Sequence, residues 1–193
     1  MQDGIGNGTT IVGLVARRQA GKNTFCKIAK LVYGEENVHV ISTSEVLGRS
    51  LDYWRVPRTK ENLQRHRVLL ANTFGGDIIL HKVEAELMEN IGKKRLIILL
   101  CVLHSTTFAL IKEYKGTLIE ITAEDEVRWK RATKNGEGGI TLEQFKANEE
   151  KETEQQTPIF MDQANKHIPN NGTIKQFETE ARKVFASLQV KQN

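Results

Sequence analysis

The chain is poor in cysteine and aromatic residues and has no long hydrophobic run. Its 193 residues include two cysteines, Cys26 and Cys101, which stand among apolar residues and read as buried free thiols in a reducing compartment. The apolar run at residues 95–103 is far too short to span a bilayer. Residues 1–8 are polar and glycine-rich, without the pattern of a signal peptide. We therefore expect a cytoplasmic protein that does not enter a membrane.

Two further shortages argue against a nucleic-acid-binding protein. Aromatic residues make up 6% of the chain, and neither a stacking motif nor a long Lys/Arg run is present. The net charge of +4 instead suits a small anionic substrate. The length and the ordinary hydrophobic share of 39% fit one domain at residues 10–193, preceded by a flexible leader at residues 1–9.

The most informative segment lies near the start of the chain. An apolar run, Thr10–Val15, predicts a buried strand, and a helical pattern begins at Lys22. A helix start of this kind offers backbone N–H groups and a positive dipole end to an anion. We therefore predict a loop that binds the phosphates of a nucleotide. Its residues are Ala16, Arg17, Arg18, Gln19, Ala20, Gly21, Lys22, Asn23 and Thr24.

This loop departs from the strict Walker A pattern G-x-x-x-x-G-K-[ST] at two positions. Ala16 replaces the first glycine, and Asn23 replaces the Ser/Thr that contacts Mg²⁺. Asn23 is then the candidate metal ligand, either directly through its amide oxygen or through water. The competing interpretation is a Gly-Lys pair at an ordinary strand–helix turn, which the two adjacent cations Arg17 and Arg18 disfavour.

Strands and helices are predicted to alternate along the chain. Further strands are expected at residues 38–42, 95–101 and 116–122, with helices between them and a last helix after Thr173. This order predicts a three-layer α/β fold with a mostly parallel five-stranded sheet flanked by helices. Ligands of such folds bind at the carboxyl ends of the strands, where the Gly21-Lys22 loop and the Ser44-Glu45 turn both lie.

Residues 124–157 differ from the rest because they are rich in charge and poor in apolar residues. A basic helix at 125–134 precedes a glycine-rich break at 136–139 and an acidic helix at 141–156. Arg128 and Arg131 are three residues apart and so share a helix face. Two helices with a thin core predict a mobile lid. A solvated helical hairpin explains the charges equally well.

The order of these motifs resembles the P-loop kinases of small molecules. The likeness is to the nucleoside- and deoxynucleoside-monophosphate kinases, including phage-type, dephospho-coenzyme-A and archaeal relatives. It rests on Gly21-Lys22-Asn23-Thr24, Arg128-x-x-Arg131 and Asn170-Asn171-Gly172-Thr173. The resemblance implies the P-loop NTPase fold and an ATP- and Mg²⁺-dependent transfer of the γ-phosphoryl group to a nucleotide-like acceptor.

The resemblance also implies a role for each site residue. Lys22 would bridge the β- and γ-phosphates, and Arg128 and Arg131 would close over the transferred phosphoryl group. Asn171 and Gly172 would lie against the adenine. The acceptor would contact Ser44, Glu45, Lys60 and Arg65.

One departure leaves the function open. The relatives carry an aspartate after the central strand, but residues 99–104 read Leu-Leu-Cys-Val-Leu-His. Glu45 or His104 could substitute, or the protein could be a catalytically weakened nucleotide-binding regulator. We favour a nucleoside or deoxynucleoside monophosphate as acceptor, with dephospho-coenzyme A as the alternative, and expect a monomer or a homodimer.

Overall fold

The structure is a computed structural model that describes residues 8–100, 105–136, 141–152, 160–188 and 190. Most of the predicted leader lies outside this range, as do the segment 101–104 that follows the third strand and all but Gly136 of the glycine-rich break predicted at 136–139. Within the described residues, no helix is both long enough and apolar enough to cross a membrane.

Five strands form one sheet in the order β2-β3-β1-β4-β5, and each neighbouring pair is parallel. The phosphate-loop strand β1 is central, between β3 and β4. This sheet confirms the predicted α/β class. The strands are β1 Thr10–Val15, β2 Val38–Ile41, β3 Leu96–Leu99, β4 Thr117–Thr122 and β5 Lys166–Pro169.

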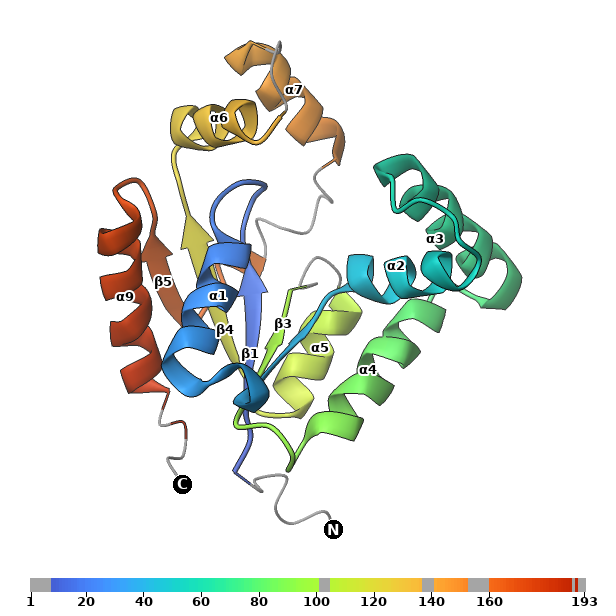
Figure 1. Cartoon of the computed structure of the whole chain (residues 1–193), viewed down its shortest axis with the longest axis horizontal. Coiled ribbons are helices and arrows are strands. Elements are labelled where there is room, and N and C mark those ends of the chain that lie inside the picture. Colours follow the sequence, from blue (N-terminus) through green and yellow to red (C-terminus); the bar gives the residue numbers. More distant parts are fainter. Residues whose placement is uncertain (1–7, 101–104, 137–140, 153–159, 189, 191–193) are drawn as a thin grey trace.

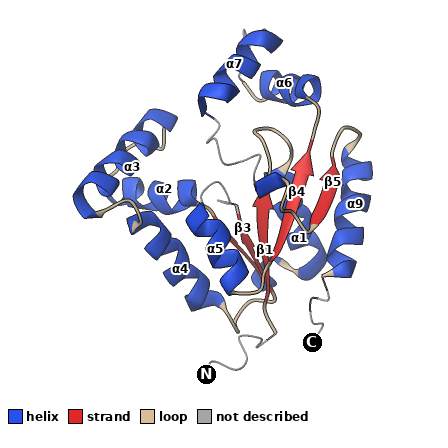
Figure 2. Ribbon diagram, turned by 180° about the vertical axis from the view of Figure 1, so that it is seen from behind, coloured by secondary structure: helices blue, strands red, loops and turns tan. Residues whose placement is uncertain are grey.

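Helices cover both faces of the sheet and extend beyond its carboxyl edge. Helices α1 and α9 lie on one face and α4 and α5 on the other, while α6 and α7 stand above the carboxyl ends of the strands (Figure 1, Figure 2). The pair α2 and α3 packs beside α4. The helices are α1 Lys22–Tyr33, the 3₁₀ turn η1 Glu35–Asn37, α2 Thr43–Tyr53, α3 Lys60–Phe74, α4 Ile78–Asn90, α5 Ser105–Glu113, α6 Asp125–Lys134, α7 Leu142–Glu152 and α9 Ile174–Ser187.

Alternation along the central strands builds a core on each side of the sheet. Val12 and Leu14 face the α1 and α9 side, whereas Ile11 and Val15 face the α4 and α5 side. All four are buried. Continuous apolar strands of this kind belong in a sheet covered on both faces, as the sequence predicted. The core therefore fixes β1 rigidly and with it the start of the loop that follows.

Side-chain caps define where several helices begin. Ser42 accepts a hydrogen bond from the backbone N–H of Glu45 at 3.3 Å, so α2 starts at Thr43, two residues earlier than the sequence pattern suggests. Thr173 and Gln176 form a reciprocal capping box at the start of α9. Helix α1 differs, because no side chain caps its first turn. Its N-terminal N–H groups therefore remain available for a ligand.

Candidate functional site

The loop between β1 and α1 has a backbone suited to anion binding. Gln19 has a positive φ of 59° and Gly21 a φ of 122°. These values turn the chain sharply, so that it enters α1 with uncapped N–H groups. The Lys22 ammonium donates to the carbonyl of Ala16 at 2.5 Å and lies 3.5 Å from that of Arg17. The loop thus folds around its own lysine.

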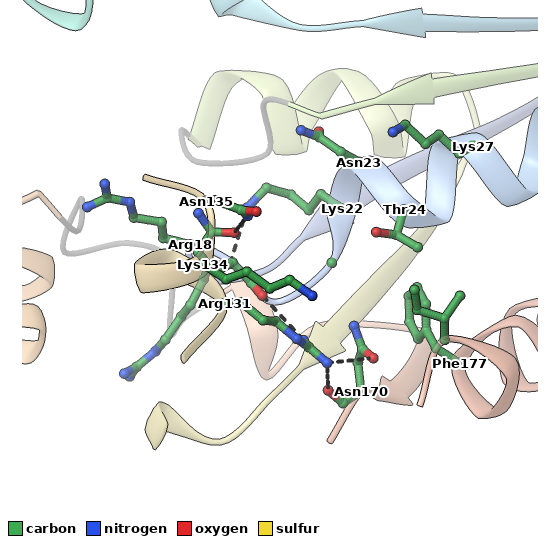
Figure 3. A pocket seen from close by; sticks show the side chains of 14 residues that line it. Arg18, Lys22, Asn23, Thr24, Lys27, Arg131, Lys134, Asn135, Asn170 and Phe177 are labelled. Atoms are coloured by element: carbon green, nitrogen blue, oxygen red, sulfur yellow. Dashed lines mark hydrogen bonds between the residues drawn. The ribbon is translucent and has the colours of Figure 1, made fainter. Parts of the chain in front are cut away.

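A pocket of about 660 Å³ opens beside this loop. Its lining comes from the loop, from α1, from the end of α6 and from the start of α9 (Figure 3). The lining residues are Arg17, Arg18, Gln19, Gly21, Lys22, Asn23, Thr24, Lys27, Arg131, Lys134, Asn135, Asn170, Ile174 and Phe177. Six of these side chains are cationic and none is acidic, so the described pocket favours a polyanionic ligand.

Burial changes the proton affinity of the central lysine. The pKa of Lys22 is lowered to about 8, because burial and the positive charge of Arg128 lower it by more than the negative charge of Glu149 raises it. Below pH 8 the ammonium form dominates and can neutralise a phosphate. Above this pH the group increasingly loses its charge.

The loop is held by side chains that donate to its backbone carbonyls. Arg131 donates to Gln19 O at 3.4 Å, and Arg128 donates to Arg18 O at 3.1 Å. Asn170, after β5, donates to Ala20 O at 2.7 Å. Three consecutive carbonyls are thereby engaged by the lid and by the β5–α9 connection. This arrangement couples the shape of the loop to the position of α6.

The two arginines of α6 occupy different environments, although the resemblance implies that both contact the phosphoryl group. Arg131 lines the pocket and donates to the carbonyl of Asn170 at 2.8 Å (Figure 3). Arg128 is fully buried and outside the pocket lining. Its five N–H donors are engaged by Ala123 O, Arg18 O, Asp125 and both carboxylate oxygens of Glu149. The structure therefore leaves Arg128 no donor for a phosphate, because an arginine has five.

The two residues predicted to contact adenine, Asn171 and Gly172, lie outside the described pocket lining. Asn171 does not line the pocket, because its side chain bonds the backbone N–H and the carboxylate of Glu124. Gly172 lies against Gln176. Asn170 faces the pocket instead, together with the exposed Ile174 of α9 and with Phe177.

The acceptor-side candidates lie on α2 and α3, away from the described pocket lining. Ser44 and Glu45 are exposed in the first turn of α2, and Lys60 begins α3. Arg65 is three-quarters exposed and pairs with Glu61 on its own helix. Arg67, on another face of α3, donates to the Thr43 hydroxyl at 3.3 Å.

Arg58, which the sequence analysis did not single out, bonds to one of the predicted acceptor residues, Glu45. It donates to Glu45 at 2.8 Å and to Asp52 at 2.9 Å, which raises its pKa. Its guanidinium lies against Gly48, where an added Cβ would be 2.9 Å from Arg58 Cζ. The absence of a side chain at Gly48 therefore lets the arginine lie flat on α2.

Six pocket residues beyond the predicted loop were also missed, namely Lys27, Lys134, Asn135, Asn170, Ile174 and Phe177. Lys27 lies one turn along α1 from Asn23, and Lys134 and Asn135 follow Arg131 at helical spacing, so periodicity could have identified them. Asn170 adjoins a predicted residue. Glu149 carried no such signal, because it is one of many acids in an acidic helix.

The described residues fit a nucleotide better than a protein-bound metal. Six cations and an uncapped helix start suit a triphosphate. Among the residues the structure describes, no group of three His, Cys, Asp or Glu side chains could hold a metal ion. Asn23 lines the pocket as a single neutral oxygen ligand. Mg²⁺ would therefore arrive with the phosphates and keep much of its water.

We predict that Gly21→Ala weakens both the fold and nucleotide binding. A Cβ at this position would lie 2.4 Å from Asn170 Nδ2, and the φ of 122° disfavours any side chain. Displacing Asn170 would also remove its bond to Ala20 O. We expect a loss of about 1–3 kcal/mol in the free energy of unfolding, measured by urea denaturation. Gly76→Ala is the control, because a Cβ there meets nothing within 4 Å.

Comparison with known proteins supports the fold. No protein-family model matches the chain, and no curated protein is similar in sequence. Among solved structures, shikimate kinase from Bacteroides thetaiotaomicron aligns at a TM-score of 0.60 and 14% identity, covering 93% of this chain and 98% of that one. TT1252 from Thermus thermophilus aligns at a TM-score of 0.57 and 19% identity, covering 94% of this chain and 98% of that one.

Dephospho-CoA kinase from Campylobacter jejuni aligns at a TM-score of 0.50 and 17% identity, covering 94% of this chain and 98% of that one. These identities are too low to transfer a substrate. The similarity therefore concerns the fold alone, an α/β architecture with a parallel sheet flanked by helices. The chain has the α/β fold of the P-loop kinases.

Proposed function

We propose that this protein is an ATP-dependent kinase of a small molecule, with a nucleoside or deoxynucleoside monophosphate as acceptor. The observation that carries the proposal is the cationic pocket around Lys22, at the carboxyl edge of a parallel sheet. Ligands of such sheets bind at this edge. A triphosphate placed along the loop would meet the uncapped N–H groups of α1 and the Lys22 ammonium.

The residues have distinct roles in this proposal. Lys22 neutralises the β- and γ-phosphates, and Thr24 contacts the α-phosphate. Arg131 is the lid arginine that faces the pocket, so it is the candidate for stabilising charge on the transferred group. Asn170 and Ile174 border the region available to the base. Phosphoryl transfer depends mainly on such positioning and charge stabilisation.

A phosphorylated acceptor agrees with the charge on α2 and α3. Arg58 is held by Glu45 and Asp52, and Arg67 reaches the first turn of α2. Arg65 points elsewhere, toward Glu61. Arg67 is therefore a better candidate than Arg58 or Arg65 for a contact to an acceptor phosphate, because it bonds a hydroxyl, whereas carboxylates already pair with Arg58 and Arg65.

Two alternatives follow from particular observations. The first alternative is dephospho-coenzyme A as the acceptor, which is supported by the similarity in fold to dephospho-CoA kinase. The missing carboxylate after the central strand favours a regulator that binds nucleotide without turnover, although residues 101–104 lie outside the described structure.

The test is an acceptor panel assayed with Mg-ATP. Ribo- and deoxynucleoside monophosphates, dephospho-coenzyme A and shikimate are each incubated with the protein and with its Lys22→Ala variant, and phosphorylated product is quantified by mass spectrometry. We expect product from a monophosphate that depends on Lys22. If only dephospho-coenzyme A or shikimate gave product, that compound would be the acceptor and the proposed monophosphate would be wrong. ATP binding without product from any acceptor would favour the regulator.

A further inference from the structure

The lid helices place one buried carboxylate against the phosphate loop. Glu149 of α7 is 7% exposed, and its two oxygens both contact Arg128 of α6. The same carboxylate lies 3.9 Å from Arg17 of the loop. Burial of an acidic side chain is costly unless it is paired with cations. Here the cations are Arg17 of the loop and Arg128 of α6, which donates to a loop carbonyl. Glu149 therefore joins α7, α6 and the loop.

We propose that Glu149 is a positioning residue for ATP binding, acting on the phosphate loop through Arg128 and on the ammonium group of Lys22. The inference rests on the proposed function, because it assumes that the loop binds ATP. It changes the role of Arg128, which the sequence resemblance assigned to the transferred phosphoryl group.

The first part of the argument concerns Arg128. With all five donors engaged, this guanidinium is fixed between Glu149 on one side and the carbonyl of Arg18 on the other. The Phe145 ring lies 5.5 Å from Arg128 Cζ and adds a packing contact. Loss of the Glu149 charge would weaken the hold on Arg128 and, through it, on Arg18. The loop would then sample shapes that do not fit a triphosphate.

The second part concerns charge. Lys22 is surrounded by cations, since Arg17, Arg18, Lys27, Arg131 and Lys134 line the same pocket and Arg128 lies behind the loop. Glu149 is the acidic group that opposes them, because it raises the pKa of Lys22 while burial and Arg128 lower it. Without Glu149, Lys22 would lose its proton at a lower pH. The ammonium needed by the phosphates would then be depleted sooner as the pH rises.

The experiment measures Mg-ATP affinity by calorimetry between pH 7.0 and 9.5. For the wild type we expect affinity to fall above about pH 8, where Lys22 deprotonates. For Glu149→Gln we expect Mg-ATP binding at pH 7 to be weaker by at least about twofold, the lower end of the couplings found within one ion-pair network. We also expect the affinity of this variant to begin its fall at a lower pH than that of the wild type.

Asp125→Asn is the matched control. Asp125 also contacts Arg128, but its side chain is 39% exposed and it does not act on the pKa of Lys22. We expect the Mg-ATP affinity of this variant to fall over the same pH range as that of the wild type. A purely structural role for Glu149 would weaken binding equally at all pH values and leave the alkaline fall in place, which contradicts the proposal. Tighter ATP binding by Glu149→Gln at pH 7 would also overturn it, since Glu149 would then be repelling the phosphates.

Glu149→Asp covers the case in which the glutamine variant does not fold. The shorter carboxylate keeps the charge but retracts from Arg128, so we expect weaker binding at pH 7 with the wild-type alkaline fall. Unchanged affinity in Glu149→Asp would overturn the proposal. Absence of ATP binding by the wild type at every pH would instead reject the proposed function, so the two failures are distinguishable.

Discussion

Replacing Lys22 by methionine is expected to reduce phosphoryl transfer by a factor of at least about 1,000. Lys22 contributes the only ammonium group in the described structure that the loop folds around, with Ala16 O at 2.5 Å. A methionine fills similar space but carries no charge for the β- and γ-phosphates. The measurement is the initial rate with the acceptor that the panel identifies.

The same substitution is expected to stabilise the ligand-free protein. The pKa of Lys22 falls from 10.5 in the unfolded chain to about 8 in the fold, so below pH 8 both states carry the proton and the full cost of burying the charge is present. As the pH rises from 8 to 10.5, the folded state releases its proton first and the cost is relieved. At pH 7 we expect Lys22→Met to raise the free energy of unfolding by about 1–2 kcal/mol.

Lys27→Met is the matched control for both measurements. Lys27 lines the same pocket but lies one turn further along α1 and is exposed. We expect turnover within a few-fold of the wild type and little change in stability. Equal losses of turnover in the two variants would show that the pocket attracts phosphate through its overall charge, and that Lys22 has no specific role.

Arg128→Ala is expected to have the largest effect on stability. The guanidinium is fully buried, and its removal leaves Glu149 buried without its bidentate partner. Breaking one side of a buried ion pair costs about 3–5 kcal/mol, which for a chain of this size lowers Tm by roughly 10 °C. Urea unfolding at pH 7 measures the loss of free energy, and thermal unfolding at the same pH measures the fall in Tm. Arg18 would also lose the donor to its carbonyl.

A double substitution separates the pair from general packing. Arg128→Met combined with Glu149→Leu removes both charges and keeps apolar volume, so it should be less destabilising than Arg128→Ala alone. A double variant that is less stable than the single variant would show that Arg128 contributes through its other contacts, to Asp125 and to the Ala123 and Arg18 carbonyls.

The sequence by itself determined the sheet and the phosphate loop. Alternating and continuous apolar runs identified the strands, because burial on one or both faces imposes a period that is visible in a linear chain. Gly21-Lys22 after such a strand identified the loop, since the requirements for a turn and a helix start are local. Thr173 likewise marked the start of the last helix through a cap that acts over three residues.

Only the tertiary structure decided which side chains face the pocket. Arg128 and Arg131 share a helix face in sequence, yet one is enclosed by α7 and the other lines the cavity. Asn170 and Asn171 are adjacent, yet they bond to different elements. Glu149 lies 21 residues from Arg128. These outcomes depend on how α6, α7 and the β5–α9 connection pack over the loop, which no local pattern encodes.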